Sequence, residues 1–243
     1  MPALETLVGS KALQTDEGRQ PHRRPAVRML VIGATRGIGL ATVREARSRG
    51  HEVAALMRPG RERLDVDSEV RTIRGDAADP EAIEAAIQGQ EAVVMSLGVP
   101  VGARRVTLFS ESTRHTLAAM KAAGVRRLVA VTGIGAGDSR GHGGAFYDRF
   151  VQPVFLRDAY ADKDRQEALI RESDLQWLIV RPGFLTNGPR SGAYRAITDL
   201  SAVEKAGKIS RADVAAFIVD QLEVPTLFGR APLLVGRVAR EDR

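Results

Sequence analysis

Short apolar runs alternate with helix-forming stretches along most of this chain. The apolar runs have the length and β-branched content of buried strands. The stretches between them show helical periodicity, and the longest stops at Gly124. Strands that alternate with helices predict a parallel sheet covered on both faces. The predicted strands cover 27–32, 52–57, 70–74, 92–97, 127–132 and 175–180, and the clearest helices cover 39–49, 80–87 and 105–123.

This pattern favours one α/β domain over residues 26–243, a doubly wound, Rossmann-like parallel sheet with helices on both faces. Residues 1–25 have mixed charge and no sustained apolar period, so we expect a flexible extension there. It lacks the basic and apolar regions of a signal peptide. Two glycine-rich segments, at about 133–157 and 184–209, are expected to be the substrate loops.

The composition narrows the possible chemistry. With 243 residues and 44% hydrophobic content, the chain can bury a full core. Because cysteine is absent, disulfides, thiolate catalysis and Cys-ligated metals are excluded, which fits a reducing, cytoplasmic compartment. The four histidines lie far apart, so no metal site is expected. No apolar run approaches the roughly 20 residues of a membrane span, so no membrane association is expected.

The charge does not indicate a macromolecular partner. The net charge is +6 and the pI is about 10.1, but the arginines are scattered through every segment and aromatic residues make up only 5% of the chain. A nucleic-acid-binding protein usually gathers its basic residues in one patch or helix. We therefore expect a small-molecule substrate and no nucleic acid, and the sequence leaves the oligomeric state open.

A glycine-spaced turn, Gly33-x3-Gly37-x-Gly39, follows the first predicted strand and opens a helix. In a dinucleotide-binding βαβ unit the pyrophosphate lies against bare backbone at the helix N-terminus, where N–H groups and the helix dipole face it. A side chain at Gly33 or Gly37 would block that approach. The turn predicts a dinucleotide site made by Gly33, Thr35, Arg36, Gly37 and Ile38.

The end of the second strand indicates which dinucleotide is bound. NAD sites usually carry an acidic residue about 20 residues after the glycines, but this chain has Arg58 there. An arginine can hold a 2′-phosphate through charge-assisted hydrogen bonds, and Arg36 could add a second charge. We therefore expect NADP(H). The alternative is that Arg58 is one more surface arginine of a loop.

Other strand ends are expected at the same crevice, because ligands of open α/β sheets lie beyond the carboxyl ends of the strands. Asp76 and Ala77 follow the third strand, and Gly98 follows the fourth. Asp76 is placed to accept a hydrogen bond from an adenine amino group. It could equally be a turn-forming aspartate.

Four motifs resemble the short-chain dehydrogenase/reductase superfamily. The chain is most similar to the atypical branch that includes NmrA-like regulators and flavin or biliverdin reductases, over residues 26–236. This resemblance implies that Pro182, Gly183 and Phe184 lie beside the nicotinamide. The motifs are the glycine turn, Gly75-Asp76, the segment Val180-Arg181-Pro182-Gly183-Phe184-Leu185, and Ile209-Ser210-Arg211-Ala212-Asp213-Val214-Ala215 at the start of a late helix.

The catalytic residues of that superfamily are only partly matched. Its usual Tyr lies four residues before a Lys, and a Ser ends the fifth strand. Here Lys163 fits the Lys, Ala159 occupies the Tyr position, and Tyr160 comes one residue late. A slip of one residue turns a helical side chain by about 100°, which predicts that Tyr160 points away from the substrate. Thr132 stands where the Ser is usual.

The candidate catalytic residues are thus Thr132, Lys163 and Tyr160, and two of them have alternative roles. Lys163 lies on an otherwise apolar helical stripe, where it either bonds the nicotinamide ribose or pairs with Glu167. Thr132 either bonds a substrate carbonyl or the carboxamide, or is a strand residue bonded to backbone.

Two functions remain in competition at this point. The first is an NADPH-dependent oxidoreductase that transfers hydride to a small conjugated or cyclic acceptor of the flavin, quinone, enone or ketone type, which needs little help from a protein acid. The alternative is a non-catalytic NADP(H)-binding redox sensor or regulator of the NmrA-like kind, and the shifted Tyr160 motivates it.

Overall fold

The computed structural model of this chain describes residues 25–60, 66, 69–201, 203 and 205–236. The extension predicted over 1–25 lies outside the described residues except at its last position. Within them, the main sheet has eight strands and a second, small sheet has two. The strands of the main sheet are β1 (Arg28–Ile32), β2 (Glu52–Met57), β3 (Arg71–Arg74), β4 (Ala92–Met95), β5 (Arg127–Val131), β6 (Gln176–Pro182), β8 (Tyr194–Ile197) and β10 (Leu233–Gly236), and the small sheet is formed by β7 (Phe184–Thr186) and β9 (Lys208–Ser210).

The main sheet has the strand order β3-β2-β1-β4-β5-β6-β10-β8. All neighbouring strands are parallel except β8 and β10, which run antiparallel at one edge. The chain moves outward from β1 in one direction to β3 and then crosses back to β4. This reversal creates a switch point between β1 and β4, where a crevice opens beyond the carboxyl ends of the strands. The doubly wound, Rossmann-like parallel sheet predicted from the sequence is confirmed.

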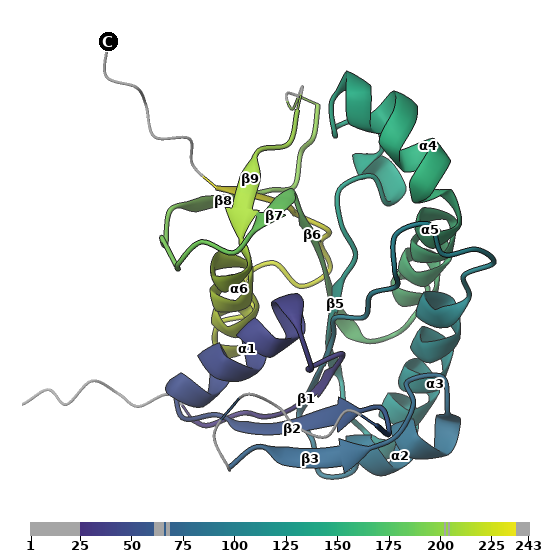
Figure 1. Cartoon of the computed structure of the whole chain (residues 1–243). Coiled ribbons are helices and arrows are strands. Elements are labelled where there is room, and N and C mark those ends of the chain that lie inside the picture. The colour runs from purple at the N-terminus through teal and green to yellow at the C-terminus, as the bar shows by residue number, and fades with distance from the viewer. Residues whose placement is uncertain (1–24, 61–65, 67–68, 202, 204, 237–243) are drawn as a thin grey trace, which may run out of the picture.

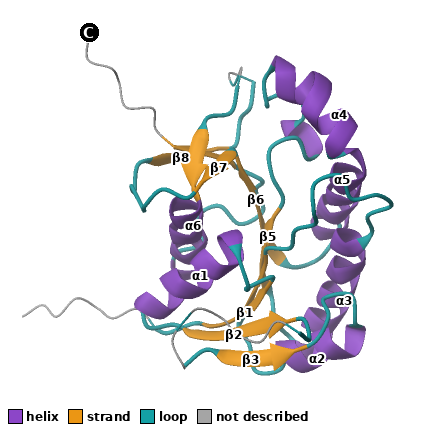
Figure 2. Cartoon of the chain, viewed as in Figure 1, coloured by secondary structure: helices purple, strands orange, loops and turns teal. Residues whose placement is uncertain are grey.

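Helices cover both faces of the sheet (Figures 1 and 2). On one side α1 and α6 pack together, and on the other side α2, α3 and α5 form a second layer. The short α4 extends beyond the end of α5. These helices are α1 (Gly37–Ser48), α2 (Pro80–Ile87), α3 (Leu108–Ala123), α4 (Gln152–Phe155), α5 (Arg157–Arg171) and α6 (Arg211–Glu223).

Alternating side chains of the central strands explain why both faces need a cover. Met29 and Val31 of β1 pack into the core under α1 and α6, whereas Leu30 and Ile32 pack into the core under α2 and α3. All four side chains are fully buried. A strand that is apolar on both faces can only be stable inside a sheet that is covered twice.

Most predicted elements of the first half lie where the sequence placed them. The bounds of β2 and α2 agree with the prediction, and Gly124 ends α3 in the left-handed conformation that favours glycine. The third helix begins at Leu108 rather than at Arg105. Arg105 has a positive φ of 51°, which is incompatible with a helix.

The two predicted substrate loops contain short elements that the pattern did not indicate. Between 133 and 157 the chain forms a 3₁₀ turn at Gly137–Ser139, a π-helical turn at Tyr147–Val151 and α4. The segment 184–209 supplies β7, β8 and most of β9. Elements of three to five residues are too short to show a period.

Among the described residues, none of the helices is long and apolar enough to cross a membrane.

Candidate active site

The N-terminus of α1 is open to a ligand. Arg36, the residue before the helix, is extended, and its side chain makes no capping hydrogen bond. Within the part of the chain that the structure describes, the first backbone N–H groups of α1 therefore have no intrahelical or side-chain partner. Gly37 has a φ of +61°, and a Cβ built there would approach only the Arg211 Nε, at 3.9 Å. Bare backbone, free N–H groups and a positive helix end together suit a phosphate group.

The three glycines of the turn have different roles. A Cβ on Gly33 would collide with the carbonyl of Ser96, and one on Gly39 would collide with the carbonyl of Gly33. These two glycines therefore let β1, β4 and α1 approach closely. Backbone packing thus gives a reason for glycine at position 33 besides the predicted approach of the pyrophosphate, and that approach stays a prediction. Only Gly37 combines open space with a positive φ.

A pocket beyond β1, β2 and β4 brings together most of the residues predicted to bind the cofactor. Asp76 lines it and also closes a turn, because its Oδ1 accepts a hydrogen bond from the backbone N–H of Ala78 at 3.0 Å. The structure therefore shows the turn-forming role of Asp76, and its contact with an adenine amino group stays a prediction. The predicted residues in this pocket are Gly33, Thr35, Arg36, Arg58, Asp76, Ala77 and Gly98.

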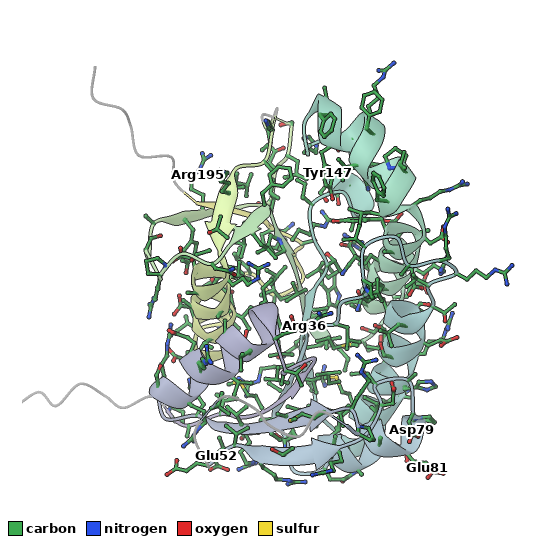
Figure 3. All side chains as sticks on the ribbon, viewed as in Figure 1. Arg36, Glu52, Asp79, Glu81, Tyr147 and Arg195 are labelled. Atoms are coloured by element: carbon green, nitrogen blue, oxygen red, sulfur yellow. The ribbon has the colours of Figure 1, made fainter. Side chains whose placement is uncertain are left out.

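Arg58 and Arg36 give this pocket two positive charges. Both side chains are exposed, and neither pairs with a carboxylate of the described residues. Figure 3 shows Arg36 beside the N-terminal end of α1. No acidic side chain follows β2 in the described part of that turn, where a ribose-binding carboxylate would stand.

A second pocket adjoins the first, because Arg36, Ser96, Leu97 and Gly98 line both. The second pocket holds all three candidate catalytic residues. It joins the N-terminus of α1 to the end of β5 and to the first turns of α5. Its predicted members are Arg36, Gly37, Ile38, Gly98, Thr132, Tyr160 and Lys163.

Lys163 lies almost completely buried in this second pocket. Burial lowers the pKa of its ammonium group to about 8, although the negative charges of Glu167 and Asp162 act in the opposite direction. Its Nζ lies 4.3 Å from the centre of the Phe109 ring, a cation–π contact. The predicted alternative, an ion pair with Glu167, is not formed, because the Glu167 carboxylate is held by other groups.

Glu167 is the centre of a buried charged network. Its carboxylate accepts a hydrogen bond from the Thr132 hydroxyl at 2.8 Å and two from the Arg181 guanidinium at 3.0 and 2.6 Å. Burial alone would raise the pKa of Glu167, but the hydrogen bonds and charge of Arg181 outweigh it and hold the pKa below its ordinary value. The network ties β5, β6 and α5 together next to Lys163.

This network restricts the roles open to Thr132. The Thr132 hydroxyl lines the pocket, but its proton is donated to Glu167. Only the lone pairs of the hydroxyl oxygen are left for a ligand, so Thr132 can accept a hydrogen bond in the pocket and cannot donate one to a substrate carbonyl in this arrangement.

Tyr160 lines the pocket, which corrects the expectation that it points away. Ala159 lies four residues before Lys163 and Tyr160 lies three residues before it. Residues three and four apart in a helix share a face, so both positions face the same side as Lys163. The Tyr160 hydroxyl lies 3.0 Å from that of Tyr147. Burial raises the pKa of Tyr160, and Tyr147 adds to the shift, so the phenol stays protonated at neutral pH.

The residues of the arginine–proline segment, expected together beside the nicotinamide, have different surroundings in the structure. The Pro182 carbonyl accepts a hydrogen bond from the Ile134 N–H at 3.1 Å, and the Gly183 N–H donates to the Leu234 carbonyl at 2.8 Å. Phe184 packs edge-on against Tyr147, with ring centres 5.4 Å apart. Phe184 lines a third pocket, made with the segments 143–151 and 205–208, and no contact of Pro182 or Gly183 tests their place beside a nicotinamide.

Arg211 is a site residue that the sequence reasoning missed. Its guanidinium lies over Gly37, lines the second pocket, and donates a hydrogen bond to the Asn187 side chain at 2.7 Å. Ser210 caps α6 by accepting from the Asp213 N–H at 3.0 Å. This Ser-x-x-Asp cap was the available signal, because it places Arg211 at the first position of the helix.

With this geometry in view, comparison with known proteins decides the family. A family model described as NAD(P)H-binding matches residues 33–225. The chain belongs to the NAD(P)H-binding family. Its relatives include the 3-diazoavenalumate denitrifying reductase of a Streptomyces species, which is 32% identical over 231 residues that cover 84% of this chain and 71% of the relative. The uncharacterized sugar epimerase YhfK of Bacillus subtilis (strain 168) is 26% identical over 211 residues, 84% of this chain and 92% of the relative.

Solved structures share the fold of this chain. ChuY, an anaerobillin reductase from Escherichia coli O157:H7, has a TM-score of 0.75 and 25% identity, and the match covers 88% of this chain and 98% of that one. A wide-type short-chain dehydrogenase/reductase from Veillonella parvula DSM 2008, solved in complex with NADP, has a TM-score of 0.70 at 21% identity and shares the fold over 89% of this chain and 98% of that one. The resemblance to atypical short-chain dehydrogenase/reductases is confirmed, and the proteins similar to this chain are NAD(P)H-dependent reductases and epimerases of that type.

Proposed function

We propose that this NAD(P)H-binding protein uses NADPH to reduce a small conjugated or cyclic acceptor. The observation that carries the proposal is the second pocket, in which Lys163 and Tyr160 face the same space as the open N-terminus of α1. Binding residues for phosphate and groups that can handle a proton therefore meet in one continuous cleft. Bound NADPH would supply the hydride.

The preference for NADPH rests on Arg58 and Arg36. Both are positively charged, free of carboxylate partners among the described residues, and on the wall of the pocket beyond β2. A 2′-phosphate gains charge-assisted hydrogen bonds there, whereas the two hydroxyls of an NADH ribose find no carboxylate. The neighbour solved with NADP shares this fold.

The chain's own residues have separable tasks in this proposal. The N–H groups after Arg36, with Arg211 above them, hold the pyrophosphate. Lys163 donates to the nicotinamide ribose from its buried position on α5. Tyr160, protonated at neutral pH, donates the proton that balances the hydride when the acceptor is reduced.

The acceptor class follows from the chemistry of the proton donor. In this site the pKa of Tyr160 is raised by burial, so Tyr160 is a weaker acid than an ordinary phenol. Conjugated acceptors stabilise the charge that the hydride leaves, and they need less acid assistance than simple ketones. Two relatives carry reductase names of this general kind, the 3-diazoavenalumate denitrifying reductase and the anaerobillin reductase.

Anaerobic oxidation of NADPH by the purified protein tests the proposal. The loss of nicotinamide absorbance is followed with flavins, quinones, enones and simple ketones as acceptors. The Lys163→Met variant is measured in parallel, because it removes the ammonium group from the cleft. Saturable turnover with one conjugated class, reduced at least tenfold in Lys163→Met, supports a reductase. Saturable NADPH binding without turnover of any acceptor would instead favour the redox-sensor function.

A further inference from the structure

The third pocket offers a distinct set of side chains next to the catalytic cleft. It has a volume of about 650 Å³, within the usual range for small-molecule sites. The Tyr147–Tyr160 hydrogen bond of 3.0 Å joins it to the cleft, because Tyr147 lines the third pocket and Tyr160 lines the second. Five of its lining residues have a methyl side chain or none, namely Gly143, Gly144, Ala145, Ala206 and Gly207.

One side of this pocket is aromatic. Phe184 and Tyr147 meet edge to face, at 85° between ring planes. Phe146 lines the same pocket and is 73% exposed, and it leans on Phe150 with ring centres 5.8 Å apart. A large ring left in water at the mouth of a pocket is stabilised when a flat ligand covers it. Figure 3 shows Tyr147 on the segment that leads into α4.

The same pocket also carries two positive charges. Lys205 and Lys208 line it, both are exposed, and neither pairs with a carboxylate of the described residues. The stem of Lys205 lies over Gly144, since a Cβ built there would come within 3.1 Å of the lysine Cδ and Cε. The stem is thereby packed along the pocket wall and only the ammonium group extends. Asp148, the acidic residue of the adjoining turn, accepts the Gly143 N–H at 3.2 Å instead of meeting a lysine.

The backbone that carries the lysines is anchored. The Ala206 N–H donates to the His142 carbonyl at 2.7 Å, and the His142 Nδ1 lies 2.6 Å from the Val203 carbonyl. The Phe184 N–H donates to the Gly207 carbonyl at 3.0 Å. Aromatic wall and cationic wall are therefore held to each other by main-chain contacts, as a preorganised site requires.

We propose that this third pocket binds the carboxylate-bearing part of a flat, conjugated substrate. Lys205 and Lys208 hold the carboxylate, and the rings of Tyr147, Phe184 and Phe146 contact the apolar face of the ligand. The conjugated end then reaches Tyr160 through the junction that the two tyrosines mark. This proposal rests on the proposed reductase function and adds the chemical class of its substrate.

Equilibrium binding of a non-reducible probe tests the site separately from turnover. The protein, saturated with NADPH, is titrated with 2-naphthoate and with its neutral counterpart 2-naphthamide. We expect the acid to bind about tenfold more tightly, since two exposed ion pairs each contribute up to about a factor of five. The preference should shrink at high ionic strength, because salt screens exposed charges.

Variants separate the lysines from general surface charge. In the Lys205→Gln/Lys208→Gln double variant the preference for naphthoate should disappear while NADPH affinity is kept. Lys121→Gln, which removes an exposed lysine near the end of α3, should retain the preference. Equal binding of acid and amide, no binding of naphthoate, or a preference that survives in the double variant would each overturn the proposal.

The same design distinguishes the two proposals. If the naphthoate preference is present but no acceptor oxidises NADPH, the reductase function fails and the anion site stands. If acceptors are turned over but their acids, esters and amides have equal KM values, the reductase function stands and the anion site fails.

Discussion

The Arg181 guanidinium and the Glu167 carboxylate form a two-pronged contact inside the protein, Nε to Oε1 at 3.0 Å and Nη2 to Oε2 at 2.6 Å. Arg181 comes from the end of β6 and Glu167 from α5, four residues after Lys163. Both side chains are essentially inaccessible to water. The pair therefore fixes the helix that carries the catalytic candidates against the end of the sheet.

Removing the charge of Glu167 should destabilise the fold. Among the described residues, Glu167→Gln leaves the buried Arg181 guanidinium with only the exposed Asp138, at 2.5 Å, as a carboxylate partner. We expect the free energy of unfolding to fall by about 3 kcal/mol, near the lower end for breaking a buried pair. Urea unfolding measures it, with Glu172→Gln, an exposed neighbour, as the control.

The pH dependence of this difference has a defined sign. Since the folded-state pKa of Glu167 lies below its ordinary value of 4.5, its contribution is fully present above pH 4.5 and is lost as the pH falls through the folded-state pKa. Wild type and Glu167→Gln should thus converge in acid. A gap that widens below pH 4.5 contradicts the assignment.

Two glycines of the same turn should respond differently to alanine. Gly33→Ala should destabilise the fold by about 1–3 kcal/mol because its Cβ meets the Ser96 carbonyl. Gly37→Ala should cost only about 1 kcal/mol for its positive φ, yet weaken NADPH binding at least tenfold. Thermal unfolding and NADPH titration measure the two effects.

Gly124→Ala is the matched control for this pair. Gly124 also has a positive φ and open surroundings, but it ends α3 away from the cleft. It should share the small loss of stability and leave NADPH binding unchanged. Unchanged NADPH binding in Gly37→Ala would remove the α1 N-terminus from the pyrophosphate site.

Arg58→Ala should weaken NADPH binding about tenfold or more and leave NADH binding nearly unchanged. A hydrogen bond to a charged group contributes roughly 1.5–3 kcal/mol, and only NADPH offers the 2′-phosphate. Titration with both nucleotides gives the comparison. Arg71→Ala, at the first residue of β3, should change the affinity for neither nucleotide. Equal losses for the two nucleotides would exclude Arg58 from phosphate recognition.

NADPH affinity should fall as the pH rises through about 8. Burial lowers the pKa of Lys163 to about 8, so the charged ammonium that donates to the ribose is present below this pH and is lost above it. Titrations from pH 7 to 9.5 should show the decline in wild type and a flat profile in Lys163→Met. A decline of equal size in the variant assigns it to another group.

Tyr160→Phe should lower turnover at least tenfold without changing NADPH affinity, because the hydroxyl serves the acceptor and not the cofactor. Tyr147→Phe removes only the hydroxyl that meets Tyr160 and should have a smaller effect. Tyr194→Phe is the control, because the Tyr194 hydroxyl donates to the Asp220 carboxylate and does not meet Tyr160. Full activity of Tyr160→Phe with every acceptor would show that another group supplies the proton.

Local sequence determined the doubly wound architecture and the cofactor half of the cleft. Apolar runs such as Met29 to Ile32 must be covered on both faces, and the Gly33-Gly37-Gly39 spacing requires a tight turn into a helix. Strand ends of a parallel sheet then meet at one edge, which is why Arg58, Asp76 and Gly98 could be placed together from sequence.

Only the tertiary structure decided which residues contact one another in the part of the cleft that holds the catalytic candidates. Thr132, Glu167 and Arg181 bond to one another from three separate parts of the chain, and no local sequence pattern indicates their pairing. Tyr160 and Tyr147 meet across a segment whose short turns have no period, and Lys205 faces Gly144 from a loop 61 residues away in sequence. Periodicity reports how a segment lies against the core. Contacts between distant segments depend on packing, and packing is decided only when the whole chain folds.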